Sequence, residues 1–383
     1  MRIKNLIYNL NYKPFLRNYI LLESNPDFSD NTKAVFDELI RLKVNEKYKL
    51  IWLVDNKKDF KDIKIKNVKF ITRKKRNTIR YRLFAKYIID CNKYIKKLNK
   101  NQFRIHLRHG TDFKDASFYN SNIGSVDVLI QLSDFFINIP SSSSFGIDKS
   151  KMIATGYPRN DWLFREDPIF KKQFKSRGQK VIVWMPTYRN HKTNTTSEKA
   201  RTSIKFKCGM PTIESETQLQ KLNTFLAKKN IILIFKPHPA EDISTLKSLN
   251  LSNIKIISNE DLIKNKYSTI YHLLSISDAL ITDYSSIYYD YLLLDKPIGL
   301  ATPDYDEFMK KVGFIFDDLK PNLPGEYFET FNGLIKFLKN VADGKDNFKK
   351  ERTAKKKLYH AHFDDKSTER VIKILLNQMA KDK

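Results

Sequence analysis

The chain reads Ile-Ile-Leu-Ile-Phe-Lys-Pro-His-Pro from Ile231 to Pro239, and this stretch decides the fold class. Five consecutive apolar residues are typical of a strand that is buried on both faces of a parallel sheet. The run ends at two prolines, which a central strand does not accommodate. An amphipathic segment at Leu219–Ala227 precedes the run and predicts a helix. A helix followed by a buried strand indicates βαβ units, and therefore an α/β protein.

The same alternation of short apolar runs and longer amphipathic segments extends along the whole chain. A polar break at residues 161–179 separates it into two sets, so we predict two domains, residues 1–170 and residues 171–383, with the C-terminal helix in the second. We expect Asp30 to cap an early helix and Ser367 to cap the last one. The predicted strands are Tyr19–Leu22, Leu50–Val54, Val68–Thr72, Tyr87–Asp90, Arg104–Leu107, Val128–Gln131 and Met152–Ala154, then Val181–Met185, Ile231–Phe235, Ile254–Ile257, Ala279–Thr282 and Ile298–Ala301.

The composition favours an anionic partner. The chain of 383 residues has 70 Lys and Arg against 43 Asp and Glu, a formal net charge of +27. Nucleic acid, an acidic membrane leaflet and phosphorylated substrates all fit this surplus, and so does a surface that is simply rich in lysine. Cys91 and Cys208 have no paired spacing, which argues against disulfides and thiolate metal sites. No apolar run reaches the ~20 residues of a spanning helix, so we expect a cytoplasmic protein.

The first polar cluster, Arg108–Lys114, follows a predicted strand. Gly110 permits a tight turn that would present His109 at the strand tip. A histidine titrates near neutral pH and can take a proton from a hydroxyl nucleophile. Asp112 could orient the imidazole and Lys114 could meet a phosphate. The alternative is a loop histidine without a role.

The second and third clusters follow strands of the second half. Arg189 ends the segment Trp184–Arg189 and offers a planar fork of donors for a phosphate, unless it is a surface arginine at a strand exit. His238 stands between two prolines and could donate to a diphosphate oxygen or protonate a leaving phosphate. The alternative for His238 is a turn histidine that only supports structure.

The fourth cluster, Thr282–Ile287, precedes a helical run. Ser285 and Ser286 would lie at the helix start, where free N–H groups attract an anion. Plain helix capping by serine explains the same pattern, and the two interpretations are compatible.

The sequence contains no phosphate-binding glycine loop and no zinc-protease motif, and the acidic pairs Asp317-Asp318 and Asp364-Asp365 lack the Asp-x-Asp spacing of a metal motif. His360 and His362 are two residues apart and could bind a metal, although loop residues beside a basic run are the simpler interpretation. We therefore expect neither a metal nor a cofactor.

Taken together and in order, these clusters resemble the CDP-glycerol:polyol-phosphate glycerophosphotransferase family, the enzymes of wall teichoic acid and related capsule synthesis. The resemblance covers about residues 20 to 370 and rests on several motifs. These are Leu22–Ser24 with Asp30–Lys33, His109–Thr111 with Lys114, Gly156–Asp161, Pro186–Arg189, Lys236–Pro239, Thr282–Ser286, and Asp290 with Leu293–Pro297.

The resemblance implies a GT-B-like fold, with two Rossmann-like domains and an active site in the cleft between them. It implies transfer of a polyol phosphate, glycerol phosphate in the first place, from a CDP-activated donor to a hydroxyl of a lipid-linked teichoic acid or capsule acceptor. CMP is released and no metal is used. His109 would be the general base and His238 would stabilise the donor diphosphate and the leaving group.

The resemblance also assigns binding residues. Asp112-Phe113 and Tyr188 depart from the pattern we expect of the family, which leaves the exact substrate open. Donor-binding roles fall to Arg189, Lys236, His238, Asp283, Ser285 and Ser286, with Asp283 shaping the pocket, and acceptor-side roles fall to Asp112 and Lys114.

A lipid-linked acceptor requires the enzyme to reach the inner face of the cell membrane. The basic stretches Arg73–Arg82 and Lys349–Lys357 could provide peripheral contact with an anionic leaflet. Two alternatives remain open. One is a GT-B glycosyltransferase that uses a nucleotide sugar, and the other is a basic nucleic-acid-binding protein, although no nucleic-acid-binding motif is found. The sequence does not distinguish glycerol from ribitol as the polyol or single addition from polymerisation. It does not specify the oligomeric state.

Overall fold

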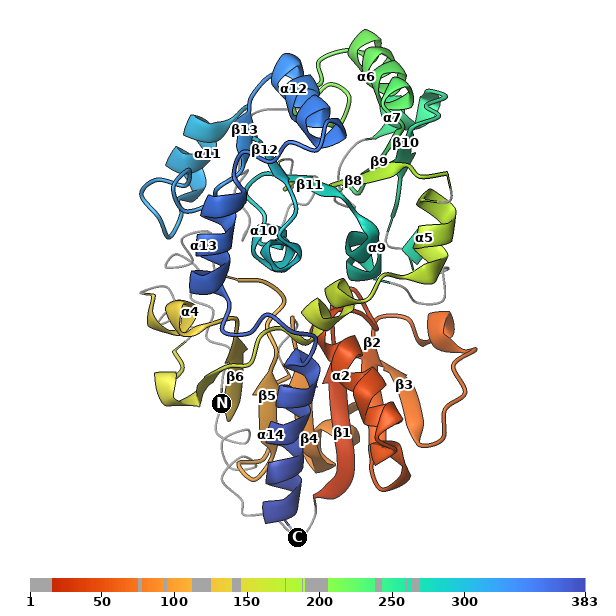
Figure 1. Ribbon diagram of the computed structural model, residues 1–383. Coiled ribbons are helices and arrows are strands. Elements are labelled where there is room, and N and C mark those ends of the chain that lie inside the picture. Colours follow the sequence, from red (N-terminus) through yellow and green to blue (C-terminus); the bar gives the residue numbers. More distant parts are fainter. Residues whose placement is uncertain are drawn as a thin grey trace. The chain divides into compact units, whose positions relative to one another are not determined.

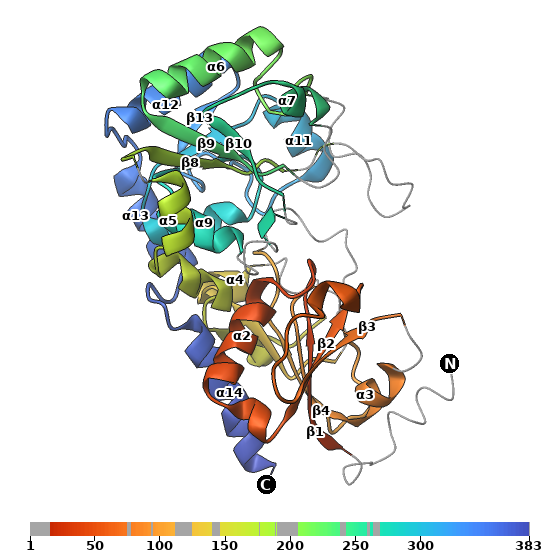
Figure 2. The same cartoon turned by 90° about the vertical axis from the view of Figure 1, so that its right-hand side faces the viewer.

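The computed structural model describes residues 16–74, 78–92, 95–111, 125–139, 146–175, 177–187, 189, 206–237, 243–258, 261–262 and 269–382 (Figures 1 and 2). The chain forms two compact units. Among the described residues, unit 1 takes in those up to Thr111, those from 125 to Asp161, and those from His360 onward. Unit 2 takes in the described residues from Trp162 to Tyr359.

Unit 1 contains a seven-stranded parallel sheet with the order β3-β2-β1-β4-β5-β6-β7. Each strand predicted for the first half is present, with ends shifted by at most two residues. The strands are β1 (Arg17–Glu23), β2 (Lys49–Val54), β3 (Val68–Thr72), β4 (Ala85–Asp90), β5 (Phe103–His106), β6 (Val128–Gln131) and β7 (Met152–Ala154).

Helices cover both faces of this sheet. Figure 2 shows α2 and α14 on one side and α3 on the other, and the buried residues Val35, Phe36 and Leu39 of α2 belong to the core of unit 1. The helices are α2 (Asp30–Arg41), α3 (Thr78–Phe84), α4 (Asp134–Asn138) and α14 (Ser367–Lys381), with short 3-10 turns η2 (Val44–Glu46), η3 (Lys57–Phe60), η5 (Lys149–Lys151) and η6 (Pro158–Phe164), the last of which runs into unit 2.

The position of α14 corrects the predicted domain assignment. We expected this helix in the second domain, but α14 packs against α2 and belongs to unit 1. Its first turn is also fixed there, because the Asp161 carboxylate accepts the N–H groups of Ser367 and Thr368 at 2.9 and 2.8 Å. Among the described residues, the chain first passes from unit 1 to unit 2 after Asp161, about nine residues before the predicted boundary. Sequence order alone does not reveal a chain that returns to its first unit.

Helix α2 also begins differently from the expectation. Ser29 occupies the N-cap position, and Asp30 is the first helical residue, with a φ of +60°. The Asp30 carboxylate instead pairs with the guanidinium of Arg159 at 2.8 Å. Asp30 is thus a side chain that connects two segments rather than a helix cap.

Unit 2 contains a six-stranded parallel sheet with the order β10-β9-β8-β11-β12-β13. The five strands predicted for the second half are present. The sixth, β13, was missed because this three-residue edge strand has no apolar run. The strands are β8 (Lys180–Trp184), β9 (Ile231–Phe235), β10 (Ile254–Ile256), β11 (Ala279–Thr282), β12 (Ile298–Ala301) and β13 (Glu326–Phe328).

Helices also cover both faces of the second sheet (Figure 1). On the face of α6 and α12, the apolar core includes Trp184, Phe235 and Ile281 from three adjacent strands. Helices α9 and α10 lie on the other face. The helices are α5 (Pro168–Phe174), α6 (Glu216–Lys228), α7 (Ser244–Ser248), α9 (Ile270–Ile276), α10 (Ile287–Tyr291), α11 (Tyr305–Val312), α12 (Phe331–Ala342) and α13 (Lys349–Tyr359), with the 3-10 turn η7 (Leu292–Leu294).

Candidate active site

In unit 2 the motif loops leave the sheet at one edge. Strands β9, β8, β11 and β12 are consecutive neighbours and run parallel, so their carboxyl ends lie side by side. Lys236 follows β9, Thr187 follows β8, Asp283 and Ser285 follow β11, and Asp304 follows β12. This edge is where open α/β sheets bind ligands.

The centre of this edge is a buried ion cluster around Arg189. The guanidinium is 1% exposed and forms a two-point contact with Asp304, with Nε to Oδ2 at 2.9 Å and Nη2 to Oδ1 at 3.1 Å. Its Nη1 donates to the Asp283 carboxylate and to the carbonyl of Thr187. Asp283 in turn accepts the backbone N–H of Thr187 at 2.9 Å. The cluster therefore ties the loops after β8, β11 and β12 together.

Aromatic rings enclose the guanidinium of Arg189. Its Cζ lies 5.5, 5.1 and 5.5 Å from the ring centroids of Phe206, Tyr284 and Phe308. The hydroxyl of Tyr284 donates to Asp304 at 3.1 Å. Burial alone would lower the pKa of Arg189, but the carboxylates outweigh it and raise the pKa above the ordinary arginine value. Arg189 therefore stays charged, and its charge is balanced by the carboxylates of Asp283 and Asp304.

This arrangement corrects the role predicted for Arg189. We expected a guanidinium that faces a donor phosphate, but Arg189 is buried and its donors are directed at Asp283, Asp304 and Thr187. Arg189 therefore acts as a positioning residue. Asp283, expected to shape the donor pocket, is equally buried and serves the same cluster. Asp304 was missed, although an aspartate shortly after a neighbouring strand was a signal that could have identified it.

Two other predicted donor-binding groups remain available to a ligand. Lys236 is half-buried, and burial lowers the pKa of its ammonium. Its backbone N–H bonds to the Trp184 carbonyl at 2.9 Å, but its side chain has no hydrogen bond or ion pair within the described residues. Ser285 and Ser286 are half-buried, and neither hydroxyl makes a hydrogen bond within the part of the chain that the structure describes. Ser286 holds the N-cap position of α10 without a side-chain cap bond, so capping does not explain it.

In unit 1, His109 follows β5 at the carboxyl edge of the sheet. Its side chain is exposed, yet the surrounding protein desolvates the imidazolium and lowers the pKa below the ordinary histidine value. Arg159 and Arg108 lower this pKa further, whereas Asp30 opposes them. The imidazole makes no hydrogen bond within the described residues. A neutral imidazole whose ring nitrogens make no hydrogen bond within the described residues is suited to accept a proton.

Behind His109 lies a buried polar cluster that sequence reasoning missed. Asp90, at the end of β4, accepts from Nδ1 of His106 at 2.7 Å and pairs with Arg104 at 2.9 Å. Asp90 and His106 are aligned partners in the sheet register. Charged residues of opposite sign at the ends of adjacent strands could have signalled the cluster, but the strand order was needed to align them.

Three predicted site residues, Asp112, Lys114 and His238, lie outside the described residues. Among the described residues, no group of three or more His, Cys, Asp and Glu side chains could hold a metal ion. None of the described helices is long and apolar enough to cross a membrane.

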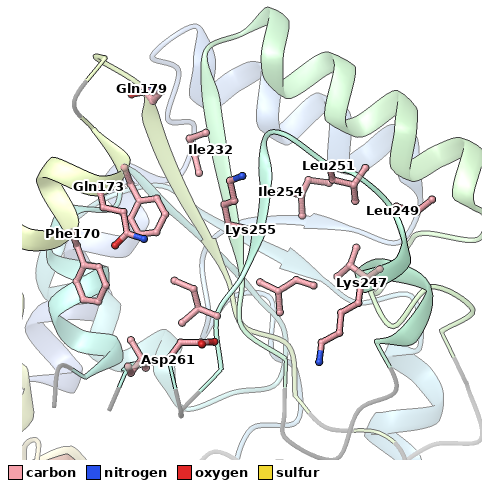
Figure 3. A pocket seen from close by; sticks show the side chains of 15 residues that line it. Phe170, Gln173, Gln179, Ile232, Lys247, Leu249, Leu251, Ile254, Lys255 and Asp261 are labelled. Atoms are coloured by element: carbon pink, nitrogen blue, oxygen red, sulfur yellow. The ribbon is translucent and has the colours of Figure 1, made fainter. Parts of the chain in front are cut away.

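A pocket of approximately 890 Å³ lies beside the edge strand β10, away from the predicted site residues, none of which lines it (Figure 3). Its walls include Phe170 and Phe174 of α5, and Lys255 points from β10 toward it. Since it shares no residue with the motif loops, we assign it no part in the site.

Two parallel α/β units, each with polar loops at the carboxyl edge of its sheet, define a GT-B-like fold. The chain belongs to the CDP-Glycerol:Poly(glycerophosphate) glycerophosphotransferase family, whose model matches residues 6–377. This match confirms the resemblance and the enzyme class inferred from the motifs. It favours neither a nucleotide-sugar glycosyltransferase nor a nucleic-acid-binding protein.

Individual relatives agree over nearly the whole chain. A teichoic acid poly(glycerol phosphate) polymerase of Bacillus spizizenii is 24% identical, with 91% of this chain and 90% of the relative covered. A teichoic acid glycerol-phosphate transferase of Staphylococcus aureus is 25% identical, with 96% and 97% covered. The solved structure of the wall teichoic acid polymerase TagF has a TM-score of 0.76 at 21% identity, and covers 99% of this chain and 93% of that one. A putative UDP-N-acetylglucosamine 2-epimerase from Listeria monocytogenes, at a TM-score of 0.54 and 11% identity, shares the fold over 95% of this chain and 97% of that one.

The buried cluster leads to a prediction about stability. Replacing Arg189 by methionine should lower the free energy of unfolding by about 3–5 kcal/mol, because two buried carboxylates lose their counter-charge. Urea-induced unfolding followed by circular dichroism measures the change. The matched control is Lys311→Met, which removes the exposed partner of Glu307 and should cost less than about 1 kcal/mol. If Arg189→Met keeps the wild-type free energy of unfolding but loses its affinity for CDP-glycerol, the guanidinium binds phosphate instead.

Proposed function

We propose that the chain transfers glycerol phosphate from CDP-glycerol to a hydroxyl group of a lipid-linked teichoic acid or capsule acceptor and releases CMP. The observation that carries this proposal is the family match over residues 6–377, which includes every motif at the two sheet edges. Relatives named as glycerol-phosphate transferase and poly(glycerol phosphate) polymerase support glycerol as the polyol. A ribitol-phosphate polymerase of Staphylococcus aureus, 25% identical, keeps ribitol as the second candidate.

The chemistry requires one proton transfer and one displacement at phosphorus. The acceptor oxygen forms a bond to the phosphorus that carries the glycerol, and the bond from that phosphorus to the bridging oxygen breaks. CMP leaves with the electron pair, and the acceptor proton goes to the base. Such transfers depend on positioning and on neutralisation of phosphate charge more than on covalent help from the protein.

We assign the base to His109, because its lowered pKa keeps the imidazole neutral near pH 7. Lys236 and the hydroxyls of Ser285 and Ser286 would contact the donor phosphates. Their support is their common sheet edge and their lack of partners within the described residues. His238 as the group that stabilises the departing CMP, and Asp112 and Lys114 on the acceptor side, remain predictions from the sequence.

The proposed reaction predicts acceptor-dependent release of CMP from CDP-glycerol. The purified chain is incubated with CDP-glycerol, or in parallel with CDP-ribitol, and a lipid-like glycerol-phosphate acceptor, and CMP is measured. We expect turnover to persist in EDTA, because the proposed site neutralises phosphate with lysine and hydroxyl donors. A nucleotide sugar serves as the control substrate. Turnover of the nucleotide sugar alone would contradict the proposal, and a strict requirement for Mg²⁺ or Mn²⁺ would contradict the metal-free site.

Substitutions at the two sheet edges should affect different kinetic quantities, kcat in unit 1 and the Kd for CDP-glycerol in unit 2. His109→Ala should lower kcat by roughly 100- to 10,000-fold and leave the Kd for CDP-glycerol nearly unchanged, since it removes only the base. Lys236→Met should instead raise that Kd by roughly 10-fold or more, through loss of a charged hydrogen bond. Calorimetric titration and the CMP assay measure both. Lys255→Met, which removes an exposed lysine of β10, is the control. Near-normal turnover of His109→Ala would reject the base.

We further propose that the enzyme binds the inner membrane leaflet peripherally through α13. Lys349, Lys350 and Lys357 are exposed on this helix, and Leu358 beside them is 43% exposed. The other basic stretch contributes less than expected at its start, because Arg73 pairs with Asp27 and Asp55. Each lysine near an anionic surface contributes ~1 kcal/mol to binding.

Neutralising these three lysines of α13 to glutamine should weaken binding to anionic liposomes by about 10- to 100-fold. Cosedimentation of the wild type should also fall as salt rises from about 0.1 to 0.5 M, because screening shortens the range of the attraction. The matched control neutralises Lys57, Lys58 and Lys61, which are exposed on unit 1. Salt-insensitive binding, or an equal loss in the control, would argue against α13 as the contact.

A further inference from the structure

The backbone that carries His109 is held by buried side chains from distant segments. Asn31, which is fully buried, donates from Nδ2 to the carbonyls of Leu107 at 3.1 Å and Arg108 at 2.7 Å. Arg108 has a φ of +52°, an uncommon conformation that such contacts can maintain. The Oδ1 of Asn31 accepts the backbone N–H of Arg159 at 3.0 Å. One asparagine therefore links the His109 loop to a second loop.

Arg159 and Tyr157 hold the next two carbonyls. The Nη1 of Arg159 donates to the carbonyl of His109 and pairs with Asp30 at 2.8 Å. The hydroxyl of Tyr157 donates to the carbonyl of Gly110 at 3.3 Å. The carbonyls of residues 107–110 are thus all bound by side chains, whereas the imidazole itself makes no hydrogen bond within the described residues. The backbone is fixed and the ring is left available.

The segment that supplies Tyr157 and Arg159 is fixed at both ends. Gly156 has a φ of +76°, and a Cβ there would lie 2.5 Å from Oγ of Ser367. Asp161 accepts two backbone N–H groups at the start of α14. The backbone on both sides of Arg159 is therefore constrained by contacts outside the His109 loop.

We propose that Asn31 and Arg159 are positioning residues for the transfer, and that they set the direction in which His109 meets the acceptor hydroxyl. The inference rests on the proposed function, because it takes His109 as the base. It gives a physical role to two motifs, around Asp30-Asn31 and at Gly156–Asp161, that carry no reacting group. Misplacing a catalytic group by about 1 Å can cost roughly 100-fold in rate.

The first test separates rate from binding. Asn31→Ala should lower kcat for CMP release by about 10- to 100-fold and change the Kd for CDP-glycerol less than about threefold. The matched control is Asn45→Ala, which removes another buried amide of unit 1 that holds a loop carbonyl, that of Lys66 at 3.0 Å. The control should keep kcat within about twofold of the wild type, and thermal unfolding checks that both variants are folded.

The second test uses the charges that face His109, which are Asp30 of α2, Arg159 of η6, Arg108 of its own loop and His106 of β5. Arg159 lowers the pKa of His109 and Asp30 raises it. Arg159→Gln should therefore move the acid limb of the pH–rate profile to higher pH, and Asp30→Asn should move it to lower pH. Arg159→Lys keeps the charge and should leave the limb in place while kcat falls. Asn tolerates the left-handed conformation of residue 30, so Asp30→Asn should fold even where Asn31→Ala does not.

The outcomes distinguish the two levels of the proposal. The positioning role would be overturned by a wild-type kcat in Asn31→Ala, or by acid limbs of Arg159→Gln and Asp30→Asn that do not move in opposite directions. The activity of His109→Ala tests separately whether His109 is the base. Full activity of His109→Ala would overturn both. Loss of kcat in Asn31→Ala with unchanged donor binding, together with opposite shifts of the acid limb, would support the inference.

Discussion

The second unit depends on one buried interaction, the contact of the Arg189 guanidinium with the carboxylates of Asp283 and Asp304. This contact joins three loops that leave adjacent strands, and the stacking of Tyr284 on Phe308 joins two of the same segments. A buried arginine between two carboxylates is favourable only when the geometry satisfies all three groups, so the cluster admits little variation in the loop positions. Ser285 depends on this arrangement, because it follows Asp283 on the loop after β11 and its hydroxyl has no hydrogen-bond partner within the described residues.

The first unit fixes its functional loop by different means. Side chains of other segments bind the backbone carbonyls of Leu107 to Gly110 one after another. Carbonyl contacts fix the backbone without using the side chains of the loop. In both units, the residues that fix a loop are therefore different from the residues that the loop presents to a ligand. A rigid sheet can in this way hold reactive side chains in a narrow range of orientations.

The strands and the edge that carries the chemistry were predictable, because buried apolar runs such as Ile231–Phe235 have few other structures open to them. The positions of His109, Lys236 and Ser285 after their strands followed directly. The role of Arg189 did not, because an arginine after a strand looks the same whether a carboxylate or a phosphate faces it. The role of Asp304 and the contacts of Asn31 could not be predicted from the sequence for a related reason. They join segments up to 128 residues apart, and no local pattern records such a distance.

The return of α14 to unit 1 makes that unit discontinuous in sequence. Its apolar face, with Val371, Leu375 and Met379, is part of the unit 1 core, and the Asp161 carboxylate meets its first turn. A fragment that stops after Asp161 would therefore leave α2 uncovered and expose apolar surface to water. Dissecting the protein into halves at one cut would fail for this reason, whereas a short linker that replaces unit 2, from Asp161 to His360, would keep unit 1 whole. The C-terminal helix also makes unit 1 the last of the two to be completed during synthesis, although its sheet emerges first.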